Sequence, residues 1–320
     1  MKKILWLTAL VILFALGTAS FASANGGPHG GYTATTDACA GCHRAHTASG
    51  PRLLVEANTT ALCMTCHNSA GTGADTNVSD GLYTASRSTT TVGAANTTDG
   101  GYLLGGGFVN QGGSAVTSTH SVDGTALAAW GNNGVARGTS QNLASGLTCA
   151  SCHDPHGSNQ YRIINNTVNS NVVAAALVDE GAAKDYDDEH WGAGQSTICA
   201  ACHSSYHQLA SGQGSTLQTG SYTHRIDMQW DADFAGAANP ESTGMGGETL
   251  PLALTDSPAA GDGVVVCQTC HLPHGSSAAM TGNADGGPDG SGTVPGDTTA
   301  TDSALLRLDN RGVCEVCHQK

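Results

Sequence analysis

Cysteine and histidine occur in this sequence in one repeated arrangement. Two cysteines separated by two residues are followed directly by a histidine six times, and these motifs contain all 12 cysteines. Two thiols at this spacing can form thioethers with both vinyl groups of one porphyrin, and the next residue then places its imidazole under the iron. The motifs therefore predict six covalently attached c-type haems. The thioether residues are Cys39, Cys42, Cys63, Cys66, Cys149, Cys152, Cys199, Cys202, Cys267, Cys270, Cys314 and Cys317, and the proximal ligands are His43, His67, His153, His203, His271 and His318.

Other chemistries also use paired cysteines, and the pattern argues against them. Zinc ribbons and redox motifs contain C-x-x-C, but neither needs a histidine after every pair. A disulfide scaffold has no reason to space its cysteines identically six times. Covalent haem attachment accounts for both the spacing and the histidines.

Six irons need six further ligands if each is to be six-coordinate. Eight histidines lie outside the motifs, whereas methionine is scarce, so bis-histidine ligation throughout is predicted. Such ligation lowers reduction potentials relative to histidine–methionine ligation and closes the position that a small substrate would need. The predicted distal ligands are His46, His120, His156, His207, His224 and His274, with His29 and His190 as the two spares.

Four of these distal histidines follow a motif closely, and one of them, His207, lies one residue further from its motif than the other three. His46, His156 and His274 each occupy the third position after a proximal histidine. A histidine so near one haem cannot easily reach the opposite face of the same iron, but it can reach a neighbouring haem. Close spacing of the porphyrins follows.

The elements that position these residues are expected to be small. Short helices should begin at the motifs, and the Gly-, Ser-, Thr- and Asn-rich stretches between them predict loops with a few short strands. The expected fold is mostly irregular coil around a stacked haem chain. Two segments, about 37–70 and 264–320, share the order C-x-x-C-H-x-x-H, a leucine-containing stretch, and a second motif.

The composition agrees with a core that is not made of side chains. Hydrophobic residues are 39% and aromatic residues 5% of the chain, which is little for a globular core. The formal net charge of −14 excludes a nucleic-acid binder of the usual basic kind. The acidic run at 283–290 could bind calcium, but it does not match an EF-hand loop, and a plain loop is the simpler interpretation.

The first residues predict export. Lys2 and Lys3 precede an apolar stretch too short to span a bilayer, and Ala22-Ser23-Ala24 fits a cleavage site. We expect a signal peptide at 1–24 and one hexahaem domain at 25–320. Removal of the two lysines makes the mature chain more acidic still, and no membrane insertion is expected.

The motifs together resemble a known family. The doubled C-x-x-C-H segments and the order of all six motifs are similar to those of multihaem outer-surface c-type cytochromes that polymerise into conductive filaments, the cytochrome nanowires. The resemblance rests on Cys-His-Arg-Ala-His ending at His46, Cys-His-Asp-Pro-His-Gly at 152–157, His207 after Cys202-His203, and His224-Arg-Ile-Asp. It implies a continuous chain of stacked haems, with His46 ligating a haem of the neighbouring subunit, the one attached at Cys267 and Cys270.

Three functions follow from these observations. The first is an extracellular electron conduit, a homopolymer that passes electrons between partner cytochromes and extracellular acceptors. The second is a monomeric electron carrier in the periplasm or at the cell surface. The third is a multihaem reductase, which the surplus of histidines and the ten basic residues outside the signal peptide disfavour. We therefore expect an electron-transfer protein and not an enzyme, with no catalytic residues.

Overall fold

The computed structural model describes a chain that is mostly irregular, with short helices and small hairpins. The residues described are 29, 39–69, 74–83, 102–124, 143, 145–175, 177–178, 190–192, 194–203, 206, 224, 226–230, 240, 249–253, 263–280, 303–310 and 312–318. The signal peptide predicted at 1–24, the acidic run at 283–290 and His207 lie outside them. The expected fold class is confirmed, because no helix among the described residues is longer than the seven residues of α8.

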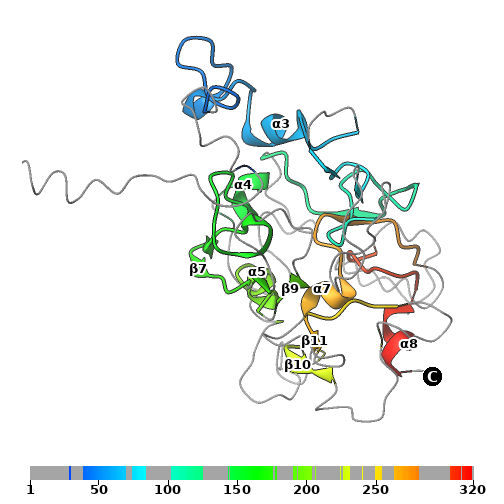
Figure 1. Cartoon of the computed structure of the whole chain (residues 1–320). Helices are drawn as coiled ribbons and strands as arrows, with labels where there is room; N and C mark the ends of the chain where they lie inside the picture. Colours follow the sequence, from blue (N-terminus) through cyan, green and yellow to red (C-terminus); the bar gives the residue numbers. More distant parts are fainter. Residues whose placement is uncertain are drawn as a thin grey trace, which may run out of the picture.

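Each of the described α-helices contains a cysteine of a C-x-x-C-H motif. They are α3 (Thr59–Met64), α4 (Cys149–Cys152), α5 (Ser196–Ala200), α7 (Cys267–Cys270) and α8 (Gly312–His318). Only α4 and α7 begin at the motif as predicted, and the other three begin a few residues before it. Figure 1 shows α3, α4, α5, α7 and α8 following one another through the molecule, with the N-terminal motif and α8 toward opposite ends. In the described part of the chain, no helix is long and apolar enough to cross a bilayer.

Paired strands of two residues each connect these helices. Four pairs are local hairpins: β1 (Thr76–Asn77) with β2 (Leu82–Tyr83), β3 (Asn110–Gln111) with β4 (Ser114–Ala115), β6 (Thr167–Val168) with β7 (Asn171–Val172), and β8 (Leu177–Val178) with β9 (His190–Trp191). Two pairs join distant segments: β5 (Ser118–Thr119) with β12 (Gly275–Ser276), and β10 (Met228–Gln229) with β11 (Val264–Val265). All six are antiparallel.

One backbone arrangement occurs three times. In each copy the proximal histidine of a C-x-x-C-H-x-x-H segment forms an antiparallel bridge to a later residue: His43 to Leu54, His153 to Ile164, and His271 to Leu306. The sequence repeat at 37–70 and 264–320 thus has the same backbone geometry at both sites. The third copy, around His153, was not predicted. We call the three copies unit A (39–67), unit B (149–203) and unit C (267–318).

In each unit, the two residues directly before the later bridge partner have positive φ. They are Arg52 (57°) and Leu53 (61°) in unit A, Arg162 (49°) and Ile163 (50°) in unit B, and Ala304 (51°) and Leu305 (63°) in unit C. Left-handed backbone costs a residue other than glycine roughly 1 kcal/mol or more, and it persists only where the surroundings fix it. Here flanking backbone bonds fix it, because N–H of Arg44, Asp154 and Leu272 donates to the carbonyl of Leu53, Ile163 and Leu305, at 2.8, 2.7 and 2.8 Å.

Buried side chains form several small clusters instead of one core. One contains Ile164, Val168, Val173, Ala175 and Ala201 and contacts Cys152. Two others, one around Met228 and Trp230 and one around Val313 and Val316, both contact Cys317. The side-chain clusters therefore meet the cysteines of the motifs, where the sequence predicts porphyrin.

Candidate haem-ligating site

Five imidazole pairs lie between segments far apart in the sequence. In each pair the ring of a proximal histidine faces the ring of a histidine outside the motifs. The centroid distances are 6.2 Å for His43 and His156, 6.0 Å for His67 and His29, 6.3 Å for His153 and His274, 6.4 Å for His203 and His120, and 6.2 Å for His318 and His224.

These distances are those expected for two ligands of one haem iron. A ligating imidazole nitrogen lies about 2 Å from its metal and the ring centre lies roughly 1 Å further out, so rings on opposite faces of one iron have centres about 6 Å apart. The planes of the paired rings differ by 12° to 79°, so stacking of the two rings does not by itself account for a common distance. Two imidazoles suffice for a haem iron, because the porphyrin supplies the other four nitrogens. Among the described residues no group of three or more His, Cys, Asp or Glu could hold a metal ion.

Each unit orients its proximal imidazole through the left-handed turn. Nδ1 of His43, His153 and His271 donates to the carbonyls of Arg52, Arg162 and Ala304, at 2.9, 2.9 and 2.8 Å. These acceptors are the first positive-φ residue of each turn. A hydrogen bond at Nδ1 fixes the tautomer and leaves Nε2 for the metal, which is the usual outer-shell arrangement of histidine ligands.

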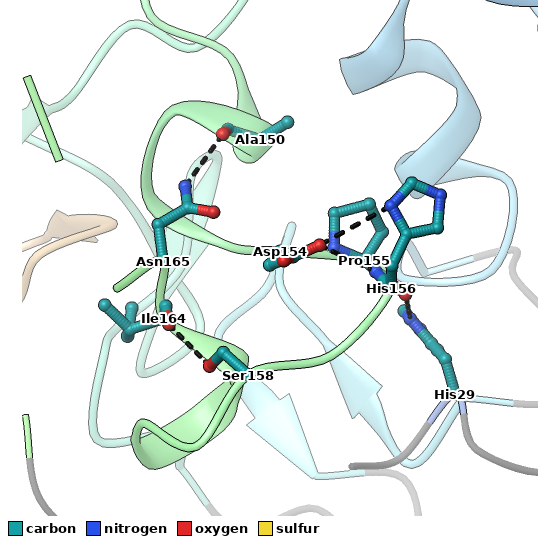
Figure 2. A network of polar contacts seen from close by, with 8 residues as sticks. All are labelled: His29, Ala150, Asp154, Pro155, His156, Ser158, Ile164 and Asn165. Carbon is teal, nitrogen blue, oxygen red and sulfur yellow. Dashed lines mark hydrogen bonds and ion pairs between the residues drawn. The ribbon is translucent and has the colours of Figure 1, made fainter. Parts of the chain in front are cut away.

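Several of the other paired histidines also have an Nδ1 partner. His67 faces Thr76, with Nδ1 2.9 Å from Oγ1 and 3.2 Å from the carbonyl. His274 donates to the carbonyl of Gly106 at 3.2 Å. His156 has Nδ1 3.5 Å from a carboxylate oxygen of Asp154 (Figure 2). The pattern at the proximal histidines therefore extends to distal ones.

Burial favours the neutral, metal-ligating form of five imidazoles. It lowers the pKa of His67, His120, His153 and His271, and it lowers the pKa of His274 to about 4. Neutral imidazole is the ligating species, so burial favours metal binding over protonation.

The cysteines are available for thioether formation. All 12 are described, and none of them is in a disulfide. The first cysteines of successive motifs meet across the helix contacts: the Cys63 and Cys149 thiols are within hydrogen-bonding reach where α3 meets α4, and so are the Cys199 and Cys267 thiols where α5 meets α7. Porphyrins attached at these cysteines would be close neighbours.

The imidazole pairs can be compared with the distal ligands predicted from the sequence. His120, His156, His224 and His274 each face a proximal histidine, whereas His207 lies outside the described residues. His29, counted among the spares, faces His67. The sequence did contain a signal for it, because one lone histidine precedes each unit: His29, His120 and His224.

His271, the first proximal histidine of unit C, is the exception. Among the described residues no histidine ring faces His271 at a comparable distance, and His46 is on an exposed turn. Of His190, the other predicted spare, only the backbone is described, in β9.

Comparison with known proteins identifies the motif and one similar structure. Residues 32–72 and 141–171 match the doubled CXXCH motif. The chain is similar to a solved structure of the Outer Membrane Cytochrome S filament from Geobacter sulfurreducens, with 19% sequence identity and a TM-score of 0.47, over 88% of this chain and 98% of the other. No curated protein matches the sequence. The family model thus covers the segment predicted at 37–70 and adds the segment around His153.

Proposed function

We propose that this chain is an exported electron-transfer protein that holds six c-type haems and polymerises head to tail into an extracellular filament. The observation that carries the proposal is the set of five imidazole pairs with centroids 6.0 to 6.4 Å apart. When bound, haem supplies one-electron exchange at its iron. The chain's own residues attach it, hold it and set its surroundings.

The ligand set of the proposal follows the pairs. His156, His29, His274, His120 and His224 are the distal ligands opposite His43, His67, His153, His203 and His318. His46 is the sixth, and His190 and His207 become the spares. With an imidazole on each face, no coordination position is left for a substrate, which favours electron transfer over a reductase.

Polymerisation is supported by how the units exchange ligands within the chain. His156 of unit B faces His43 of unit A, and His274 of unit C faces His153 of unit B. Units B and C therefore each direct their H-x-x-H histidine at the unit before them. Unit A has no preceding unit in the described chain, and unit C has no following one. When the same exchange extends from one copy to the next, His46 of unit A ligates the iron above His271 of unit C in another copy.

Such an exchange generates a filament. The donor and acceptor surfaces differ, so the contact between copies is heterologous, and a heterologous contact that does not close on itself gives an open helical polymer. A metal–ligand bond across each junction makes the polymer hard to dissociate. A monomeric carrier would leave His46 exposed and the iron above His271 with one protein ligand.

The test uses mature protein purified with its haems. Intact mass is expected to show six haems per chain, low-temperature electron paramagnetic resonance to show low-spin ferric iron, and negative-stain microscopy to show unbranched filaments. Small uniform particles with one high-spin haem per chain would support the monomeric carrier instead. A predominantly high-spin spectrum would contradict the ligand set itself.

A further inference from the structure

The junctions between units contain a second contact besides the exchanged ligand. His29, the lone histidine before unit A, has Nδ1 3.2 Å from the carbonyl of Pro155 in unit B (Figure 2). His120, the lone histidine before unit B, has Nδ1 2.6 Å from the carbonyl of Pro273 in unit C. Each acceptor is the residue directly before the H-x-x-H histidine of the following unit. One loop thus serves two haem sites, through a side chain and through the carbonyl beside it.

The ends of the chain also have the two positions of this contact: a lone histidine before a unit, and the residue directly before an H-x-x-H histidine. His224 is the lone histidine before unit C and faces His318. Ala45 directly precedes His46 in unit A, as Pro155 precedes His156 and Pro273 precedes His274. We propose that the carbonyl of Ala45 in one copy accepts a hydrogen bond from Nδ1 of His224 in the next copy. The loop 44–46 then completes two haem sites of its neighbour, those above His271 and His318. This rests on the proposed polymer and extends it to a specific contact.

The exposure of the two ends agrees with this contact. Ala45 and His46 are exposed in unit A, and His224 and His318 are exposed beside unit C. Within the chain the corresponding helices touch, α3 with α4 and α5 with α7. By the same rule α8 contacts the Cys39–Cys42 turn of another copy, and Cys39, Cys42 and Cys314 are exposed thiols. Figure 1 places these two ends at opposite sides of the molecule, as a head-to-tail contact requires.

Charge also favours a second copy of this chain as the partner that the unit A loop contacts. Arg44 in the unit A loop is exposed and replaces Asp154 and Leu272 of the other units. Glu315 on α8 is exposed as well. Opposite charges on the two faces favour contact between unlike ends and disfavour contact between like ends.

The decisive measurement is a cryo-electron microscopy map of the haem-loaded filament. The expected result is an Ala45 carbonyl oxygen within about 3.2 Å of His224 Nδ1 across every junction, the distance range of an N–H···O bond. Filaments in which these atoms lie apart would overturn the inference and leave the proposed function intact. The absence of any filament would remove both.

A variant pair tests the contact in solution. Ala45→Trp puts a large ring on the exposed loop without touching either ligand, and Val172→Trp puts the same ring on the exposed β6–β7 hairpin, where Val172 is 83% exposed. Sedimentation should show the critical concentration for assembly at least tenfold higher for Ala45→Trp and unchanged for Val172→Trp. The ratio of low-spin to high-spin iron in dispersed subunits should be the same for both. Assembly of Ala45→Trp at the wild-type concentration would overturn the inference.

Discussion

The junctions inside the chain and the two ends of the chain use the same residue positions in different states. At the A–B junction His156 faces His43 at 6.2 Å, and at the B–C junction His274 faces His153 at 6.3 Å. At the ends, His46 is exposed and no described histidine faces His271. In the proposed polymer each unit has a neighbour on both sides, and the end units find theirs in other copies. On that proposal the chain is a three-unit segment of a longer array.

The largest expected effect comes from removing the ligand at the end of the array. His46→Ala should abolish filaments and leave about one sixth of the iron high-spin, because a haem with one axial histidine is five-coordinate. His156→Ala is the matched change at an internal junction. It should also give about one sixth high-spin iron, but with filaments retained. Microscopy and electron paramagnetic resonance on both variants make the comparison. Filaments from His46→Ala would contradict the exchange between copies.

The second prediction concerns the spare histidines. His29→Ala should convert one haem per chain to high-spin, because its ring lies 6.0 Å from that of His67. His190→Ala and His207→Ala should leave all the haems low-spin. A low-spin spectrum for His29→Ala, together with high-spin iron in His207→Ala, would restore the ligand set predicted from the sequence.

A third prediction compares the units through the residue that follows the bridge. Arg307 in unit C corresponds to Val55 and Asn165, since the backbone N–H of each donates to the second motif cysteine's carbonyl, at 2.9, 3.0 and 2.8 Å. The Arg307 guanidinium is held by the carbonyls of Gln268 and Leu104, at 2.7 and 2.8 Å. Burial lowers its pKa to about 10, so it stays charged at neutral pH.

A fixed positive charge near His271 disfavours the ferric state of a haem ligated there. Arg307→Gln should therefore lower one of the six reduction potentials, on the order of 60 mV for a tenfold change in a one-electron equilibrium. Arg44→Gln removes an exposed charge that salt screens, and it should change the potentials much less. Spectropotentiometric titration of soluble subunits measures both. Equal shifts for the two variants would show that burial of the positive charge does not determine its effect on the reduction potential.

The smallest effect is expected at the loop itself. Ala45→Pro gives unit A the residue that units B and C have before their H-x-x-H histidine. It should stabilise the subunit by about 0.4–1 kcal/mol, because proline restricts the unfolded chain. Denaturant unfolding in the His46→Ala background, which keeps subunits apart, measures this. Destabilisation would mean that the unit A loop differs in backbone from its counterparts.

The sequence encodes the predicted chemistry more locally than the architecture. Each motif predicts thioether attachment and a proximal ligand within five residues, so no distant contact is needed to propose them. The irregular fold with short helices also followed, because long amphipathic segments are missing from the sequence. The unit B repeat was overlooked because Tyr161-Arg162-Ile163-Ile164 contains no leucine, although its φ angles and hydrogen bonds copy those of the other units.

The distal partners depended on tertiary structure. His29 in Gly-Pro-His-Gly-Gly has nothing in its local sequence that distinguishes a ligand from a loop histidine, yet the fold brings it to His67 and Pro155. The sequence alone determined the number and spacing of the C-x-x-C-H motifs and a surplus of histidines, and from these it predicted six haem attachment sites with their proximal ligands, because each motif is short and contiguous. Only the tertiary structure decided which histidine faces which, because a distal ligand must come from a segment packed on the opposite face of the haem, whose distance along the chain no local pattern encodes.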